Sequence, residues 1–476
     1  MSDSAQAATS GYRSPGVRML SYFGRVNYNY QDKYMATAIL RADASSKLIK
    51  ENRWKYFPSA SLGWNVTNED FFDVYPISYL KLRFGWGQNG NIGSLSPFEY
   101  ASVIQAGAVD SYYTDQGTLV GAAPVATSNP NLVWETVQQT NFGIDARFFN
   151  DALSLTTDLY WKKTIDLITT MSIPEYIGNV KPAANEGDVM NRGIEMELRY
   201  KGKAFGINYD IAAVAAYNHN EVTKLDGKLI GANLGTTGWI TEAQQGQPIW
   251  YFYGYEALGI FDSFDEINAY VNEDGDLIQS SAIPGDVKFK DINGDGVIDE
   301  NDKNMIGNPH PDWTLGLNVN LDYRGFDLKI FLQSSLGQDV YFGAYRTDLN
   351  NNNKPTFLYD NAWTPEDHSG EFPRYTVTDN NGNYSHNSLF VFDGSFVRLQ
   401  NLELGYSFSA PLLDKLHISK LRLYVSGQNL FVITKYPGAD PEVGNSNGGD
   451  FKSSVGVDRG LYPRARVVSF GVNLSI

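Results

Sequence analysis

The feature that most constrains the fold is a strict alternation of apolar and polar residues in two adjacent segments. Apolar side chains occupy every second position from Trp313 to Tyr323, with mostly polar residues between them. After the dipeptide Arg324-Gly325, the same alternation continues from Phe326 to Leu332. Because successive side chains of a strand point to opposite faces, the pattern predicts an antiparallel hairpin with one apolar and one polar face.

This alternation recurs along the chain and predicts about thirteen strands. Aromatic residues make up 14% of the sequence and charged residues 19%, a balance that favours pleated, half-buried surfaces over helices. We therefore expect an all-β fold. The predicted strands are centred near Tyr28, Leu40, Leu62, Phe84, Phe142, Leu155, Met196, Ile211, Leu317, Ile330, Leu404, Leu423 and Phe470.

The connections between the predicted strands alternate between tight turns and long polar excursions. The tight turns fall at residues 31–33, 149–152, 201–205 and 323–325, and the excursions at 90–132, 164–187, 222–308 and 337–394. Short periplasmic turns and long extracellular loops are typical of an antiparallel transmembrane β-barrel, whose apolar face meets lipid and whose polar face lines a wet lumen. The alternative is a soluble β-sandwich or propeller with its polar faces outward.

The strand count also bears on closure of the barrel. An odd number of strands cannot close an antiparallel barrel, so we expect residues 1–476 to form one part of a larger one.

Residues 250–261 also have a strand-like pattern. Counting them would place the tight Arg324-Gly325 turn on the side of the long loops. We therefore predict that they lie within a long extracellular excursion at residues 222–310.

Residues 291–302 have the spacing of a calcium-binding loop. Oxygen ligands stand at positions 1, 3, 5, 9 and 12 of the twelve, with a glycine for the sharp turn at position 6. The predicted ligands of a structural calcium ion are Asp291, Asn293, Asp295, Asp299, Asp302 and the main-chain carbonyl of Val297. The alternative is a solvated Asp/Asn/Gly turn, because flanking helices are missing and position 12 is Asp instead of Glu.

Aromatic residues in the predicted excursions are candidates for substrate binding. They are Tyr112, Tyr113, Trp239, Trp250, Tyr251, Tyr253 and Trp363. Such side chains stack on sugar rings or hold peptides, and they serve equally well to pack loops together or to face a partner protein.

Composition argues against several other functions. The formal charge of −16, without clusters of Lys and Arg, disfavours nucleic-acid binding. The chain has no Cys, which excludes thiolate nucleophiles and thiolate metal sites. Its five His are scattered, with no pair at the spacing of a zinc site. We therefore expect no enzymatic activity.

Several stretches, occurring in this order, resemble SusC/RagA-type TonB-dependent transporters. They include FGRVNYNYQDKYMATAILRADASSK, RWKYFPSASLGWNV, NPNLVWETVQQTNFGIDARFF, GDVKFKDINGDGVIDENDK, GNPHPDWTLGLN, FVRLQNLELGYSF, LRLYVSGQNLFVITKYPGADPEV and YPRARVVSFGVNLSI. The resemblance implies the C-terminal portion of a barrel of roughly 22 strands in the bacterial outer membrane. It also implies import of glycans or oligopeptides together with a SusD-like surface lipoprotein.

The same resemblance implies parts that residues 1–476 do not match, namely a plug domain and the segment through which TonB acts. We expect a complementary N-terminal chain or segment to supply them and to complete the barrel. Cargo would then pass the polar residues Asn141, Asp145, Arg147, Glu195, Glu197 and Arg199. The rival hypotheses are a non-transporting outer-membrane platform or anchor for surface protein assembly and, third, a soluble carbohydrate-active enzyme.

Overall fold

A computed structural model describes residues 16–102, 104–115, 117–124, 127–170, 182–234, 238–344, 355–409, 413, 418–444 and 453–475. Its dominant element is a sheet of thirteen strands that follow one another in chain order. The strands are β1 (Met19–Tyr30), β2 (Tyr34–Ser45), β3 (Trp54–Asn65), β4 (Ile77–Asn91), β7 (Glu135–Phe148), β8 (Leu153–Ile165), β11 (Asp188–Ala204), β12 (Ile207–Lys224), β19 (Trp313–Tyr323), β20 (Phe326–Leu336), β23 (Phe396–Ser407), β24 (Lys420–Thr434) and β26 (Val467–Ser475). Each predicted strand centre falls within one of them.

Two of the hairpin turns show why tight connections form where they do. Arg324 and Gly325 join β19 to β20 with φ values of 47° and 89°. Phe205 and Gly206 join β11 to β12 with φ values of 52° and 83°. Two left-handed central residues give the type I′ turn, whose twist matches that of the flanking strands. The prediction of a turn beginning at residue 201 was wrong, because β11 continues to Ala204 and the favourable glycine comes later.

The chain divides into two compact units. The first comprises residues 1–62, 84–140 and 162–188. It contains the β1–β2 hairpin, the β5–β6 hairpin (Ile104–Thr114 and Gly117–Pro124) and the short pair β9 (Ile168–Thr170) and β10 (Ala183–Asn185). Its buried core gathers Leu48 of the β2–β3 connection, Phe57 of β3, and Leu132 and Trp134, which precede β7. The Trp134 indole N–H donates to the Arg53 carbonyl at 2.9 Å.

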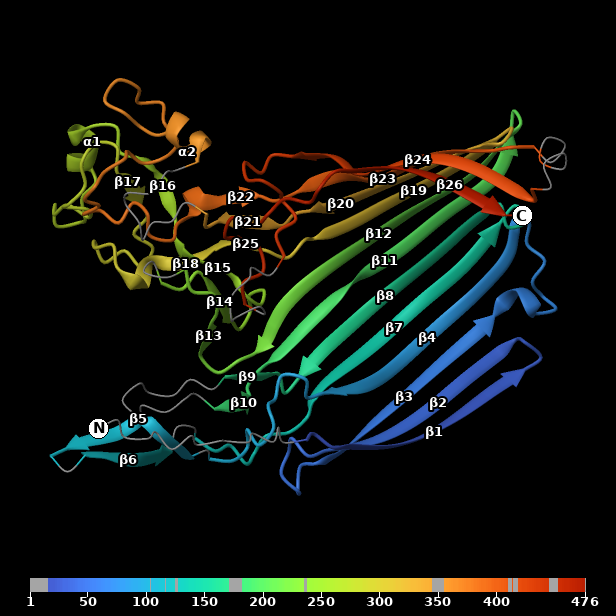
Figure 1. Ribbon diagram of the computed structural model, residues 1–476, viewed down its shortest axis with the longest axis horizontal. Helices are drawn as coiled ribbons and strands as arrows, with labels where there is room; N and C mark the ends of the chain where they lie inside the picture. Colours follow the sequence, from blue (N-terminus) through green and yellow to red (C-terminus); the bar gives the residue numbers. More distant parts are fainter. Residues whose placement is uncertain are drawn as a thin grey trace, which may run out of the picture. The chain divides into compact units, whose positions relative to one another are not determined.

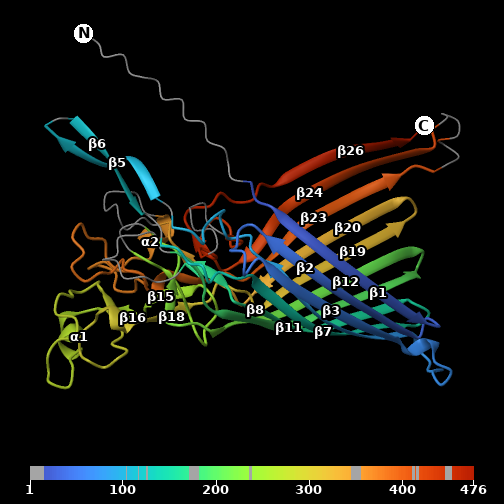
Figure 2. The same ribbon diagram turned by 90° about the horizontal axis from the view of Figure 1, so that it is seen from below.

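The second unit comprises residues 63–83, 141–161 and 189–476. Its strands from β12 to β26 pair consecutively and antiparallel, with Asn208 opposite Asp322 and Lys329 opposite Glu403. Bulges interrupt the register near Leu399. Figures 1 and 2 show the short elements of this unit gathered at one end of these long strands.

These short elements form small sheets built from the long excursions. Four strands pair in the order β13 (Lys228–Ile230), β14 (Thr241–Gln244), β15 (Tyr251–Tyr255) and β18 (Lys303–Gly307). The others are β16 (Ala257–Ile260) with β17 (Val287–Phe289), and β22 (Val391–Asp393), β21 (Asp339–Phe342) and β25 (Val457–Asp458). β15 and β16, which cover most of residues 250–261, thus lie outside the main sheet, and their place on the extracellular side stays a prediction.

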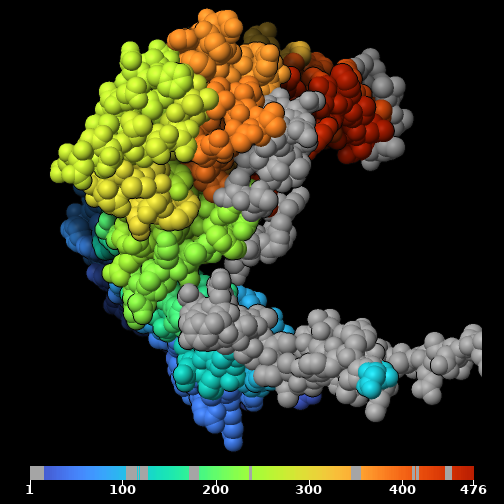
Figure 3. All heavy atoms as spheres, turned by 90° about the vertical axis from the view of Figure 1, so that its left-hand side faces the viewer, coloured from blue at the N-terminus to red at the C-terminus, as the bar shows by residue number. Residues whose placement is uncertain are grey.

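A buried aromatic core holds this end of the second unit together. Phe252, Tyr341, Phe342 and Phe390 belong to one cluster and are each at most 4% exposed. The helices α1 (Phe264–Ala269) and α2 (Thr356–Asp360) and the 3-10 turns η4 (Glu300–Asp302) and η5 (Ser388–Phe390) are short. In Figure 3 the lime and yellow residues of the excursion at 222–308 and the orange residues after 355 form one continuous surface. In the described part of the chain, no helix has both the length and the apolar character of a membrane span.

Candidate functional site

The two faces of the main sheet differ from those of a soluble protein. On β24, Leu423 is 43% exposed, whereas its neighbour Arg422 is 9% exposed. On β26, Phe470 and Val472 are 84% and 63% exposed. Large apolar side chains that face outward along a sheet, beside charged side chains that face inward, are expected where the outside is lipid. This arrangement argues against the soluble sandwich and propeller.

Ion pairs between strands link the polar face. Arg83 on β4 contacts Asp145 on β7 and Asp158 on β8, at 2.8 Å each. Arg199 on β11 contacts Asp210 on β12 at 2.5 Å. At the other end of the sheet, the Arg422 guanidinium contacts Asp327 on β20 and Glu403 on β23.

Two of these ion pairs and one hydrogen bond pass over a glycine on the strand between the partners. Gly405 of β23 separates Asp327 from Arg422, and a Cβ there would lie 2.6 Å from both Asp327 Oδ1 and Arg422 Nε. Gly143 stands in the same way between Arg83 and Asp158. In the third bridge, the Tyr160 hydroxyl donates to Asn218 at 2.8 Å across Gly193. The missing side chain lets two polar groups meet across an intervening strand.

The polar residues predicted to line a cargo path take part in separate local contacts and do not form one cluster. Asp145 and Arg199 belong to the ion pairs above, and Arg147 lies 3.8 Å from Asp151 with its guanidinium over the Tyr79 ring. Asn141, Glu195 and Glu197 lie on β7 and β11. The structure therefore places all six residues on strands of the main sheet.

The predicted substrate-binding aromatics do not all come together. Trp239 and Tyr253 line a cavity of about 610 Å³ on the four-stranded sheet. Tyr251 is buried beside it and donates to Glu242 at 2.9 Å. Trp250 precedes β15, in the left-handed region with φ of 60°.

The remaining aromatics lie elsewhere. Trp363 is 7% exposed and its indole faces Asp262 at 3.4 Å, so it packs loops together. Tyr112 and Tyr113 lie on β5 in the first unit, and their side chains fall outside the described part of the structure.

The cavity also contains two ion pairs that sequence reasoning missed. Lys228 lies 2.9 Å from Glu242, and Lys303 lies 2.7 Å from Glu300. Burial acts to lower the pKa of Lys228, but the hydrogen bond and charge of Glu242 outweigh it and raise that pKa. Burial has the opposite effect on a phenol and raises the pKa of Tyr253. Glu300 and Lys303 are three residues apart, whereas Lys228 and Glu242 belong to a distant part of the sequence, so no single motif signals the four together.

The predicted calcium loop is closed by contacts to its own main chain. Asp291 accepts from the N–H groups of Gly294 and Gly296 at 2.7 and 2.8 Å. The buried Asp302 accepts from Ile292 and Asp299, both at 2.8 Å. Among the described residues, no three carboxylate or imidazole side chains are grouped as they would be around a metal ion. The calcium site therefore stays a prediction.

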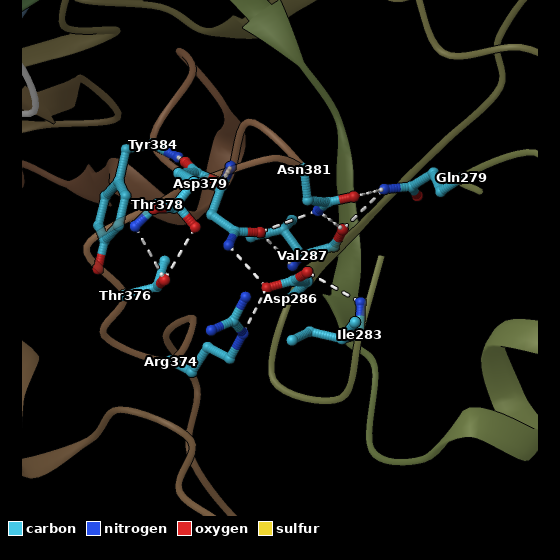
Figure 4. Close-up of polar contacts among 11 residues, drawn as sticks. Gln279, Ile283, Asp286, Val287, Arg374, Thr376, Thr378, Asp379, Asn381 and Tyr384 are labelled. Carbon is cyan, nitrogen blue, oxygen red and sulfur yellow. Dashed lines mark hydrogen bonds and ion pairs between the residues drawn. The ribbon is translucent and has the colours of Figure 1, made fainter. Parts of the chain in front are cut away.

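A buried polar network connects the excursion at 222–308 with the excursion at 337–394, as Figure 4 shows. Asp286, 1% exposed, accepts from Arg374 Nε at 2.8 Å, from the Ile283 N–H at 2.9 Å and from Asn383 Nδ2 at 2.9 Å. Asn381 donates to the Val287 carbonyl at 2.9 Å. Because buried polar groups are costly unless paired, this network fixes residues 279–287 against residues 374–384.

Comparison with known proteins agrees with a main sheet that exposes its apolar face. The family model described as TonB dependent receptor-like, beta-barrel matches residues 2–430. The chain belongs to this family. TonB-dependent receptors are outer-membrane β-barrel proteins and not enzymes, and exposed apolar side chains on the main sheet, such as Leu423, are what the lipid-facing surface of such a barrel requires.

Individual relatives support the resemblance to SusC and RagA. The receptor segment is 34% identical to TonB-dependent receptor P3 of Formosa agariphila, over 96% of this chain and 45% of that receptor. It is 32% identical to TonB-dependent receptor SusC of Bacteroides thetaiotaomicron, over 96% of this chain and 43% of SusC. The structure of the RagAB peptide transporter matches with a TM-score of 0.79 and 24% identity, over 97% of this chain and 47% of that one. The chain thus spans less than half the length of the curated relatives it matches.

Proposed function

We propose that the chain forms part of a TonB-dependent outer-membrane importer of glycans or oligopeptides. The proposal rests on the main sheet, whose apolar side chains are exposed and whose charged side chains are buried, as Leu423 and Arg422 show. A wall of this kind has lipid on one side and room for a hydrated path on the other. The relatives support import in particular, since one is named SusC and another structure is titled a peptide transporter.

The importer would need parts beyond residues 1–476. Because the chain spans less than half of its curated relatives, we propose that another chain or segment supplies the plug, the TonB contact and the remaining strands. The resemblance to SusC/RagA-type transporters supports a SusD-like surface lipoprotein as the partner that captures cargo. The rigid outer end, with its aromatic core and the Asp286 network, offers a fixed surface for such a partner.

The import proposal is tested by asking whether uptake depends on TonB. Cells that express the whole transporter would be given labelled oligosaccharides or labelled peptides, with and without functional TonB. We expect uptake of one class of cargo that stops when TonB is removed. Uptake that continues without TonB would contradict the proposal, and a transporter-dependent surface assembly without any uptake would favour the platform.

We also propose that residues 291–302 bind a structural calcium ion. The ligand spacing supports the proposal, as does the closure of the loop by Asp291 and Asp302, which holds both ends of the twelve residues together. Calorimetry on the folded protein checks it directly. A titration that shows no heat of binding at millimolar calcium would end the proposal.

A further inference from the structure

The cavity on the four-stranded sheet has the dimensions of a small-molecule site. Its volume of about 610 Å³ lies within the usual range of roughly 300–1,000 Å³ for such sites. Residues of all four strands, β13, β14, β15 and β18, line it together with the turn η4. We propose that this cavity binds a neutral oligosaccharide, with one sugar ring stacked on Trp239. The inference rests on the proposed import function and names the class of its cargo.

The aromatic lining suits a sugar ring. Trp239 is 47% exposed, so its indole is open to a ligand, and Tyr253 lies in the same cavity. A pyranose ring has apolar C–H faces and hydroxyl groups around its edge. An open indole covers such a face while the neighbouring polar groups meet the edge.

The charges in the cavity are balanced in pairs. Lys228 is paired with Glu242 at 2.9 Å, and Lys303 with Glu300 at 2.7 Å. A ligand with net charge would therefore meet one like charge for every opposite one. A neutral ligand with adjacent hydroxyl groups fits better, because each hydroxyl can donate to a carboxylate and accept from an ammonium group.

The polar side chains are also held in place before a ligand arrives. Glu242 accepts from the Tyr251 hydroxyl at 2.9 Å. The Lys228 ammonium lies 4.9 Å from the centre of the Tyr253 ring, and the Lys303 ammonium lies 5.0 Å from that of Tyr255. Side chains that are already ordered lose less conformational entropy on binding.

The lining is poorly suited to a peptide. Peptide sites provide a sheet edge for main-chain hydrogen bonds or apolar pockets for side chains. Among the described residues that line this cavity, Ile230 is the one aliphatic side chain. A peptide would thus find charged pairs where it needs apolar contacts.

The test uses the purified outer-membrane complex that contains the full chain, applied to an array of neutral oligosaccharides and to a peptide library. The Trp239→Ala variant removes the stacking surface, and Tyr359→Ala is the matched control, since Tyr359 is 69% exposed on α2 and outside the cavity lining. We expect binding of at least one oligosaccharide, weakened about tenfold or more by Trp239→Ala and less than about twofold by the control. A second variant, Ile230→Trp, should block binding by filling the cavity from an exposed position.

Three results would overturn the inference. One is that no oligosaccharide on the array binds, another is binding that both cavity variants leave unchanged, and the third is a peptide whose binding depends on Trp239. Uptake in the same strains separates this inference from the import proposal. TonB-dependent uptake that Trp239→Ala and Ile230→Trp leave unchanged overturns the inference alone, whereas uptake without TonB overturns the importer.

Discussion

Gly405 offers a direct test of the glycine bridges on the polar face. It lies opposite Asp327 on one side and opposite Tyr424 on the other, and the Arg422 side chain reaches over it to Asp327. The Gly405→Ala substitution adds a methyl group 2.6 Å from Asp327 Oδ1 and from Arg422 Nε, so at least one of these two side chains must move. We therefore expect the substitution to separate Arg422 from Asp327.

Two opposing effects set the change in the free energy of unfolding that Gly405→Ala causes. Alanine in a strand is favoured over glycine by about 0.5–1 kcal/mol, because glycine loses more backbone freedom on folding. Loss of a hydrogen bond to a charged group costs about 1.5–3 kcal/mol, and here the two side chains are only 11% and 17% exposed. The second term is larger, so Gly405→Ala should lower the free energy of unfolding by about 1–2 kcal/mol.

Guanidinium unfolding of the folded complex in detergent measures this difference. Gly85→Ala is the matched control, since Gly85 lies inside β4 and a Cβ added there would meet no atom within 4 Å. In an Arg422→Gln background, the penalty at position 405 should shrink, because the two substitutions act on one contact. Equal unfolding free energies for Gly405→Ala and Gly85→Ala would refute the reasoning.

Three further predictions concern the outer end of the second unit. Asp286→Ala should destabilise the joined excursions by about 3 kcal/mol, because it leaves Arg374 and Asn383 without their buried acceptor. Faster amide exchange at Val287 would report it, and unchanged exchange would contradict it. Burial lowers the pKa of His386 to about 4. Since the unfolded imidazole titrates near 6.5, stability should fall as the pH drops from about 6.5 towards 4, and His386→Gln should flatten that slope in near-ultraviolet circular dichroism. Calcium removal should increase protease cleavage within residues 291–302, and Asp291→Ala should make cleavage independent of calcium. Cleavage that is identical with and without calcium would argue against the ion.

The sequence by itself determined the strands of the main sheet and which of their residues share a face. Alternation along a strand such as Trp313–Tyr323 is a local property, because it depends on the backbone period of two and on no distant partner. The type I′ turn at Arg324-Gly325 was predictable for the same reason. The exact turn between β11 and β12 was not, because the Lys-Gly-Lys run at residues 201–203 suits either a turn or an exposed strand end.

Only the tertiary structure decided which side chains meet. The bridge from Asp327 over Gly405 to Arg422 depends on the register of three strands, and register is set by pairing between segments. The cavity likewise joins Lys228 to Glu242 and Lys303 to Glu300 around Trp239. Glu300 and Lys303 are close in the sequence, but Lys228, Glu242 and Trp239 come from other segments, and no spacing in the sequence fixes how these segments approach one another.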